Sequence, residues 1–422
     1  MAQLKDDCFA FGDQLMPLNE ALEILHDRLV PVVGEETVPL RQALDRILAE
    51  DVESDRNVPP HDNSAVDGYG VYFEDLNPDG ETRLPVRGRV AAGHPLDGDA
   101  ARGAAVRVFT GAPMPGGDGG GPDTVFMEED VTVDGDDVLL PAGLKRGSNR
   151  RDAGEDVKAG DVIIRRGQRL RAQEAGLAAS VGRADLAVYQ RLRAAVFSTG
   201  DEVRDPGSDA PDGCIYDANR YAIMALLEGL GCAVTDLGIL ADDEETIAGA
   251  LAKAAADHDL LITSGGVSAG EEDHVKAAVE RHGRIDFWRL AIKPGRPIAL
   301  GQVDGTAFVG LPGNPVAAMV TFMVVARPLV LGLAGVGNAP AHRFRVAAGF
   351  DYKKKEGRRE WARATLESGA DGQLTAQKYK SSGAGILTSM VESDGLIELG
   401  EDVTAIAPGE MVEFLPFSEV IR

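Results

Sequence analysis

Cysteine is scarce in this sequence of 422 residues. It contains only Cys8, Cys214 and Cys232, and no two of them form a C-x-x-C pair. This shortage excludes a disulfide framework and a cysteine-based zinc site, and it fits a reducing compartment. The histidines show no H-x-x-x-H spacing either, so a histidine metal site is not expected.

A long uninterrupted apolar segment is also missing. The most apolar stretch, residues 316–337, is broken by Arg327 and Pro328, so we expect a buried helix and not a membrane span. The first 15 residues carry acids where a signal peptide needs a basic region followed by an apolar one. We therefore expect a soluble, cytoplasmic protein.

Positive charge and aromatic side chains are the next shortages. Asp and Glu number 68 against 43 Lys and Arg, which gives a net charge of −25, and aromatics make up 5%. A field of that sign repels phosphates and anionic lipids, so we expect no nucleic-acid partner and no membrane partner. Only 11 of the 43 cations are Lys. This balance indicates a halophile-like protein from a salt-rich cytoplasm, with lineage-specific codon usage as the alternative.

The length predicts more than one domain, since domains hold about 150 residues each. Leucines recur at helical spacing from Leu18 to Leu29 and again from Leu40 to Leu48. This spacing predicts two amphipathic helices within residues 17–50.

The sequence pattern changes over residues 59–146, where short apolar runs alternate with turn residues such as Gly, Pro and Asp. Such a pattern is typical of an all-β module. We expect this module to be inserted in a mixed helical domain formed by residues 1–58 and 147–190.

Strands and helices alternate over residues 191–336, with strand-like runs such as RAAVFSTG and LLITSGG. This alternation predicts parallel pairing and a doubly wound α/β sheet. The unbroken apolar strands agree, because both faces of such a sheet are covered. Residues 337–422 carry short β-like runs that predict a small C-terminal β-barrel. The expected fold class is therefore multidomain α/β plus β.

Loops that follow the predicted strands carry the candidate chemistry. In open α/β sheets, ligands bind beyond the carboxyl ends of the strands, so these loops should converge on one crevice. The glycine-rich run from Ser264 to Gly270 offers backbone N–H groups that can wrap an oxyanion. The segment GLPGNPV opens a helix and points amides and the positive dipole end at an anion. Lys293 and Arg296 would add full charges.

Carboxylates in the same loops are candidate metal ligands. Asp201, Glu202, Asp242 and Asp273 offer the hard oxygen atoms that Mg²⁺ prefers. Each piece alone has a plain alternative, since Gly-Gly loops are common turns and most of the 68 acids face solvent. Their joint placement after successive strands favours a site for a phosphate-bearing ligand, a divalent cation and a second anion.

Further polar loops occur outside the α/β segment. PPHDNSAVDGYG, which begins at Pro59, is dense in residues that compete with the backbone for hydrogen bonds, so a rigid polar turn is its simplest interpretation. TGAPMP begins at Thr110, and GSNRRDAGEDV begins at Gly147. In this order, followed by FSTGDEV, TSGGVSAGEED, AIKPGRP and GLPGNPV, the motifs resemble the MoeA family of molybdopterin molybdenumtransferases, relatives of the gephyrin E domain. The resemblance spans about residues 17–420.

The resemblance implies an enzyme that inserts molybdate into adenylylated molybdopterin with Mg²⁺ and releases AMP. It implies four domains, one of them MogA-like, and a homodimer in which the β module of one subunit leans toward the α/β crevice of the other. It also makes handover from a molybdopterin adenylyltransferase an expectation. By motif position, the implied catalytic residues are Asp62, Thr110, Asp156, Glu202, Asp242, Asp273 and Lys293, with Glu202, Asp242 and Asp273 as metal ligands. The implied substrate-binding residues are Arg151, Ser264, Gly265, Gly266, Ser268, Arg289, Arg296, Pro312, Gly313, Asn314 and Arg358.

The sequence departs from the family pattern at three places. Arg289 stands where the family usually has Lys, the loop GGDGGGPD is longer, and Ala384 falls near a frequent Ser. Two alternative functions stay open. A molybdopterin adenylyltransferase resembles residues 192–330 but lacks the β module, and a non-catalytic scaffold needs an exposed apolar groove. Tungstate has nearly the same size and charge as molybdate, so the sequence does not separate the two substrates.

Overall fold

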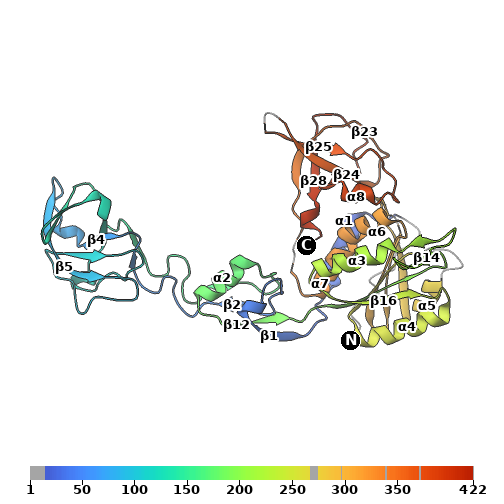
Figure 1. Cartoon of the computed structure of the whole chain (residues 1–422), viewed down its shortest axis with the longest axis horizontal. Coiled ribbons are helices and arrows are strands. Elements are labelled where there is room, and N and C mark those ends of the chain that lie inside the picture. The colour runs from blue at the N-terminus through green and yellow to red at the C-terminus, as the bar shows by residue number, and fades with distance from the viewer. Residues whose placement is uncertain (1–14, 267–273, 296, 338–339, 370–371, 422) are drawn as a thin grey trace.

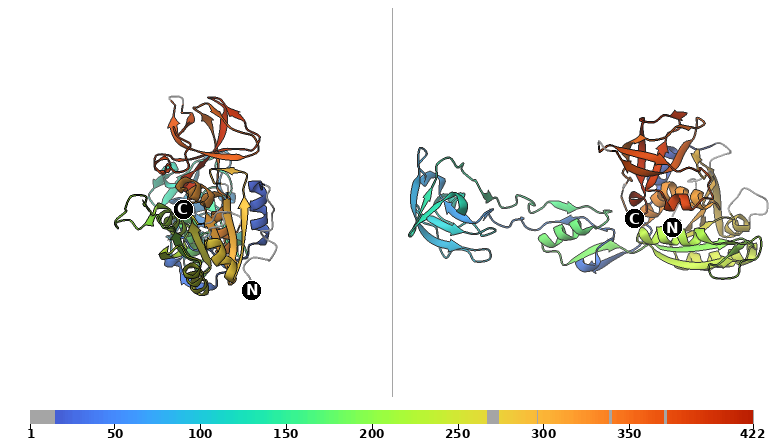
Figure 2. Two further views of the ribbon diagram at one scale, coloured as in Figure 1. Left: turned by 90° about the vertical axis from the view of Figure 1, so that its right-hand side faces the viewer. Right: turned by 45° about the horizontal axis from the view of Figure 1, so that its top comes forward.

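The computed structural model describes residues 15–266, 274–295, 297–337, 340–369 and 372–421. The molecule is elongated, with a β-rich body at one end and a narrow middle body (Figure 1). Two further bodies pack against each other at the opposite end, as the two additional views show (Figure 2). Functional groups of one chain are therefore distributed along a long axis.

The α/β body at one end contains a six-stranded sheet in the order β16-β13-β17-β21-β20-β18. Its strands are β13 (Arg193–Thr199), β16 (Ala233–Leu240), β17 (Leu260–Ser264), β18 (Gly283–Arg289), β20 (Pro297–Val303) and β21 (Thr306–Leu311). The first four strands in the sheet order pair in parallel, as the sequence predicts, whereas β20 and β18 are antiparallel to their neighbours. The difference arises at Asp304 and Gly305, which both take positive φ and form a two-residue hairpin turn.

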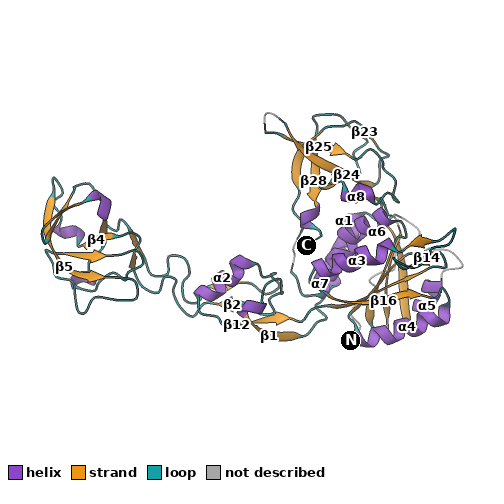
Figure 3. Cartoon of the chain, in the orientation of Figure 1, coloured by secondary structure: helices purple, strands orange, loops and turns teal. Residues whose placement is uncertain are grey.

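Helices cover both faces of this sheet (Figure 3). They are α3 (Ala218–Gly229), α4 (Glu244–Asp257), α5 (His274–His282), α6 (Pro315–Thr321) and α7 (Arg327–Leu333), with a π-helical turn at Phe322–Ala326 between the last two. Asp217 caps α3 and Asp243 caps α4, because each carboxylate accepts a backbone N–H of the first turn. Two short strands, β14 (Val203–Arg204) and β15 (Ile215–Tyr216), flank the loop before α3.

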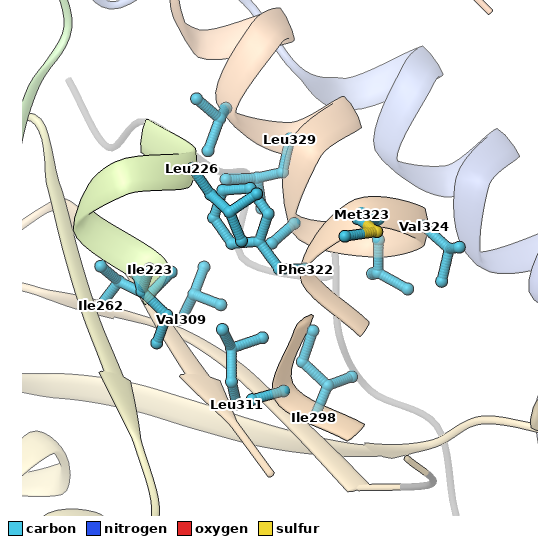
Figure 4. Packing of buried hydrophobic residues seen from close by; sticks show 14 of the residues in the cluster. Ile223, Leu226, Ile262, Ile298, Val309, Leu311, Phe322, Met323, Val324 and Leu329 are labelled. Carbon is cyan, nitrogen blue, oxygen red and sulfur yellow. The ribbon is translucent and has the colours of Figure 1, made fainter. Parts of the chain in front are cut away.

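Apolar side chains of the sheet alternate between two cores. Val196 of β13 faces the core beneath α3, α6 and α7, whereas its neighbour Phe197 faces the core beneath α4 and α5. Figure 4 shows the first core, in which Phe322 lies near Leu226 and Leu329. The segment Pro315–Leu333 is long and apolar enough to cross a membrane, but 78% of its most apolar window is buried in the protein.

The body packed on the α/β unit is a closed barrel. Its strands are β22 (Phe344–Ala348), β24 (Arg359–Ser368), β25 (Leu374–Lys378), β26 (Gly395–Leu399) and β28 (Met411–Pro416), with β23 (Tyr352–Lys353), β27 (Ala405–Ile406), α8 (Thr388–Val391) and a 3₁₀ turn at Phe417–Glu419. Pairing of β24 with β26 closes the ring, which confirms the expected C-terminal barrel. Strand β19 (Ile292–Lys293) lies between β18 and β20 in the sequence of the α/β body. It pairs in parallel with the first two residues of β24.

The β-rich body at the far end holds a second six-stranded sheet in the order β7-β4-β6-β5-β9-β8. Its strands are β4 (Gly68–Val71), β5 (Thr82–Val90), β6 (Ala105–Val108), β7 (Thr124–Met127), β8 (Thr132–Asp134) and β9 (Asp137–Leu140), with 3₁₀ turns at Phe73–Asp75, Asp118–Gly120 and Glu128–Asp130. Two small apolar cores, one around Phe126 and one around Val106, stabilise this sheet.

The middle body is built from antiparallel strand pairs and one helix. Its elements are β1 (Glu35–Pro39), β2 (Val52–Glu53), β11 (Val162–Ile164), α2 (Ala172–Ser180) and β12 (Asp185–Tyr189). The pairs are β1 with β12 and β2 with β11. The chain passes to and from the β-rich body through β3 (Asn63–Ser64) and β10 (Arg150–Arg151), which pair with each other.

One of the two helices predicted near the N-terminus forms and the other does not. Helix α1 (Leu18–Arg28) contacts α7 in the α/β body. The second segment, from Leu40 to Leu48, follows β1 and instead contains a 3₁₀ turn at Leu40–Gln42 and a residue with positive φ, Asp45. Leu44 is 55% exposed, so the leucine spacing there does not mark a helix face. Leu48 is fully buried and forms a β-bridge with Val188 of β12. Here pairing with a distant strand overrides the local preference for a helix that the leucine spacing indicates.

Candidate functional site

Two glycine-rich loops lie side by side at the carboxyl edge of the parallel strands. Ser264 ends β17 in register with Leu311, which ends β21, so the loops that follow start together. The backbone N–H of Gly265 donates to the carbonyl oxygen of Leu311 at 3.1 Å. A Cβ on Gly266 would lie 2.8 Å from Cγ2 of Thr199, and φ is +64° there, so only glycine fits.

Asn219 of α3 holds the two loops together. Its Nδ2 donates to Oγ of Ser264 and to the carbonyl oxygen of Gly313, both at 2.7 Å. Oγ of Ser264 in turn donates to the carbonyl oxygen of Pro312 at 2.9 Å. The predicted residues Ser264, Gly265, Pro312 and Gly313 are thus brought together through a residue that the motif analysis did not single out.

The N-terminus of α6 is adjacent to these loops, but one of its amides is occupied. Asn314 takes the N-cap position without a side-chain capping bond, and Pro315 begins the helix. The N–H of Val316 donates to the carbonyl oxygen of Ala384 in the barrel at 2.9 Å. The barrel therefore covers part of the helix end that the sequence assigned to an anion.

Two predicted metal ligands lie on exposed loops of the α/β body. Oγ1 of Thr199 donates to Oδ1 of Asp242 at 2.9 Å, which orients that carboxylate, and Glu202 is exposed beside Gly200. Asp273, the third predicted ligand, lies outside the described residues, as does Ser268. Within the ranges that the structure describes, no three His, Cys, Asp or Glu side chains gather as a metal site.

Lys293 lines a small cavity between the α/β body and the barrel. Its Nζ donates to Oε2 of Glu360 at 3.1 Å and lies 3.5 Å from the hydroxyl of Tyr352. Other charged side chains of the cavity are Arg363 and Lys378, both from the barrel. Sequence motifs indicated only Lys293, because the other members come from strands that pack against it from far along the chain.

The cavity perturbs the titration of its cations. Burial disfavours the charged amine of Lys293, but the hydrogen bonds and charges of Glu360 and Tyr352 together outweigh burial and raise the pKa. Burial lowers the pKa of Lys378, and the nearby charges of Arg363 and Lys293 lower it further. Burial also lowers the pKa of Arg363. Lys378 is therefore an incompletely compensated cation, which favours an anionic ligand.

Two other predicted cations, Arg289 and Arg358, do not line this cavity. Arg289 is exposed at the end of β18, and its carbonyl oxygen accepts the N–H of Met16 at 2.9 Å. Arg358 directly precedes β24, and its carbonyl oxygen accepts a hydrogen bond from Nζ of Lys354 at 2.8 Å. Arg296 lies outside the described residues.

Asp62 and Thr110 stabilise loops of the β-rich body. Oδ1 of Asp62 accepts the N–H of Ala153 at 2.8 Å, and Oδ2 lies 3.5 Å from Nη1 of Arg150. The N–H and Oγ1 of Thr110 both donate to Oδ1 of Asp67, at 2.8 and 2.7 Å, which lowers the pKa of Asp67. In this chain Asp62 holds together the two segments of the neck between the middle and β-rich bodies, and Thr110 orders the residue that precedes β4.

Arg151 and Asp156 share a cavity at the same neck. The cavity has a volume of about 440 Å³ and is lined by Val58, Pro59, Asn63, Arg151, Glu155 and Asp156. Within one chain this cavity and the α/β loops lie at different places along the long axis (Figure 1). The structure thus gathers the predicted residues into two separate groups.

Three sequence-family models cover most of the chain. The MoeA N-terminal region (domains I and II) matches residues 16–182, a probable molybdopterin-binding domain matches residues 195–332, and the MoeA C-terminal region (domain IV) matches residues 345–417.

Full-length relatives agree with these matches. A molybdopterin molybdenumtransferase of Haemophilus influenzae is 38% identical over 410 residues, covering 96% of this chain and all of the relative. Molybdopterin molybdenumtransferase 2 of Mycobacterium tuberculosis is 35% identical over 389 residues, covering 89% of this chain and 94% of the relative. The crystal structure of the molybdopterin biosynthesis MoeA protein from Pyrococcus horikoshii OT3 matches 96% of this chain and all of that one, with a TM-score of 0.81 and 29% identity. The chain belongs to the MoeA family of molybdopterin molybdenumtransferases.

Proposed function

We propose that this protein transfers molybdenum from molybdate to adenylylated molybdopterin and releases AMP, a step of molybdenum cofactor biosynthesis. Family membership supports the reaction. The observation that carries it is the meeting of two candidate anion-binding elements at α6. The loop Pro312–Asn314 leads into this helix, and Gly295, next but one to Lys293, lies against Ala317 and Thr321 of the same helix.

Each element suits one anionic part of the substrates. Ser264, Gly265 and Gly266 with Pro312, Gly313 and Asn314 would hold the phosphate, and Ser268 extends the same run. Lys293, with Arg289, Arg296 and Arg358 around it, would hold molybdate against a net charge of −25. No nucleophilic Cys, Ser or His is required, since positioning and electrostatic stabilisation supply most of the acceleration in such transfers.

Mg²⁺ would be held by Glu202, Asp242 and Asp273. The two described carboxylates fit this cation, because they are exposed oxygen ligands beside the phosphate loops and Asp242 is oriented by Thr199. When bound, Mg²⁺ supplies charge neutralisation at the phosphate bond that breaks. Thr199 would keep the Asp242 carboxylate directed during this step.

We infer that the working unit is a homodimer with composite sites. In one chain the middle and β-rich bodies extend away from the α/β body (Figure 1), so a second copy would have to bring its neck cavity to the α/β loops. A groove of about 970 Å³ between α1, α7 and the barrel, with Leu22 and Leu331 among its apolar residues, offers a face for association. A scaffold role also needs such a groove, so the activity assay below separates the two functions.

The cellular setting follows from the proposed reaction. We place the protein in the cytoplasm, where a molybdopterin adenylyltransferase would hand over its product. We attribute the acidic composition to a salt-rich cytoplasm. Tungstate would compete with molybdate, since the two ions share shape and charge.

Two assays test this proposal. Wild-type protein, adenylylated molybdopterin and Mg²⁺ should release AMP only when molybdate is added, and the rate should be maximal at high salt. Asp156→Asn and Lys293→Ala should each be inactive alone. After unfolding and refolding as a mixture, they should regain activity, because the heterodimer contains one intact composite site. Tight substrate binding without AMP release would favour a scaffold, and failure of the mixture to recover would contradict composite sites.

A further inference from the structure

Glu360 is a buried carboxylate inside a cavity that otherwise carries positive charge. The residue is 3% exposed on β24. Its Oε2 accepts a hydrogen bond from the hydroxyl of Tyr352 at 2.9 Å and one from Nζ of Lys293 at 3.1 Å. A buried carboxylate is costly unless it is paired, so this arrangement restrains both donors.

The backbone fixes which residues meet. Strand β19 pairs in parallel with β24, and the register places Lys293 opposite Glu360. Lys293 therefore reaches the cavity from the α/β body while its counter-ion belongs to the barrel. Any shift between the two bodies would move Nζ of Lys293 away from Oε2 of Glu360.

The charged side chains around the cavity favour binding of an anion. Lys293, Arg363 and Lys378 are cationic, and Glu360 is the one carboxylate among the described residues that line the cavity, so the formal charge is +2. Arg363 is held by Oγ of Ser389 and the carbonyl oxygens of Ser381 and Gly383. A net positive charge attracts an anion to this place, and the carboxylate of Glu360 weakens that attraction.

We propose that Glu360 is a positioning residue that also limits the affinity of the site for anions. It fixes Nζ of Lys293 for the reaction, and its negative charge offsets one of the three cations, so that a bound dianion is held less tightly. The inference relies on the proposed function only for the identity of that dianion. Tyr352 assists by donating to the same carboxylate oxygen.

Two substitutions separate charge from position. Glu360→Gln keeps the side-chain length and removes the charge, so the cavity becomes more positive and Lys293 loses its anchor. Glu360→Asp keeps the charge and withdraws the carboxylate from Nζ of Lys293. Glu401→Gln is the matched control, because Glu401 pairs with Arg359 at 3.1 Å outside the cavity.

The test measures binding of molybdate and of perrhenate, a tetrahedral monoanion of similar size, to the full-length protein by equilibrium dialysis. For Glu360→Gln we expect molybdate to bind about tenfold more tightly and perrhenate about threefold, since the Coulomb energy scales with ligand charge. Glu360→Asp should leave both affinities within about twofold of wild type. Glu401→Gln should alter neither.

The second part of the test measures kcat and KM of the same variants. In the AMP-release assay, both Glu360 variants should lose kcat at least tenfold, and Glu360→Gln should combine that loss with a lower KM for molybdate. A merely structural residue would not lower KM. Equal changes for both anions, or no change, would overturn the electrostatic role, and full kcat in both variants would overturn the positioning role. If wild type releases no AMP while the binding pattern holds, the proposed function fails and the inference about the cavity survives.

Discussion

Asn219 lies between the two glycine-rich loops and donates to both, with its Nδ2 2.7 Å from Oγ of Ser264 and 2.7 Å from the carbonyl oxygen of Gly313. Both amide hydrogens are thus used to hold the loops in one geometry. The spacing between the two sets of backbone N–H groups is set by a helix residue and not by the loops alone.

Replacing Asn219 by Asp should separate the loops. A carboxylate cannot donate, so it would face the carbonyl oxygen of Gly313 with like partial charge. We expect kcat/KM to fall about 100-fold, because small displacements of positioning groups have costs of that order. AMP release measures the effect, and Glu228→Ala on the exposed face of the same helix is the control. Wild-type kinetics in Asn219→Asp would contradict the proposed arrangement.

Removing Lys293 should affect both stability and activity. Lys293→Met leaves Glu360 buried without its cation, which we expect to cost about 1–3 kcal/mol of the free energy of unfolding. The double variant Lys293→Met/Glu360→Gln should regain most of this stability and remain inactive. Urea unfolding and AMP release measure the two properties. If Lys293→Met is as stable as wild type, the pairing with Glu360 contributes nothing to the fold.

Gly295 should not tolerate a side chain. Its φ is +83°, and a Cβ there would lie 2.3 Å from Oγ1 of Thr321. Gly295→Ala should therefore displace the loop that follows Lys293 and lower both Tm and activity. Gly409→Ala is the matched control, since φ is +88° and nothing lies within 4 Å of its Cβ. Both variants bear backbone strain of about 1 kcal/mol, so equal losses of Tm would argue against the contact with Thr321.

Glu174 should contribute stability that acid removes. Its carboxylate accepts hydrogen bonds from the Arg171 side chain and backbone, which lower its pKa to about 2. Because this value lies below that of the unfolded chain, the stabilisation is present above about pH 4.5 and is lost as the pH falls toward 2. It amounts to up to about 3 kcal/mol at pH 7.

The variant Glu174→Gln checks this effect. It should be less stable than wild type at pH 7 and equal to it near pH 2, as measured by urea unfolding. Glu280→Gln, on the exposed end of α5, should match wild type throughout. A pH-independent loss in Glu174→Gln would indicate a packing defect instead of a charge effect.

The fold could be anticipated wherever local pattern and tertiary pairing agree. Alternating strands and helices predicted the parallel part of the α/β sheet, and short β-like runs predicted the barrel that follows. The hairpin at Asp304 and Gly305 was missed because alternation alone does not register a two-residue turn. The segment near Leu44 was assigned to a helix because spacing cannot report that the chain pairs with β12 instead.

The candidate site, like the fold, could be predicted from the sequence only in part. Glycine-rich loops after strands have a recognisable pattern, so Ser264 and Gly313 were found from sequence. Glu360 lies 67 residues from Lys293, and its role depends on the register between β19 and β24. Asn219 lies 45 residues before Ser264 and occupies an ordinary helix position. Neither carries a local signal, since both act through contacts that form only after folding.

The pairing of β19 with β24 makes the α/β body and the barrel inseparable as building blocks. A fragment that ends after α7 would keep Lys293 but lose the strand beside it and the carboxylate opposite it. Its edge would expose unpaired backbone groups, which promote association with other chains. Fragment expression and domain exchange should therefore keep residues 191–422 together with helix α1, whose Leu18 and Leu25 belong to the same core, although the sequence predicts separate domains over residues 191–336 and 337–422.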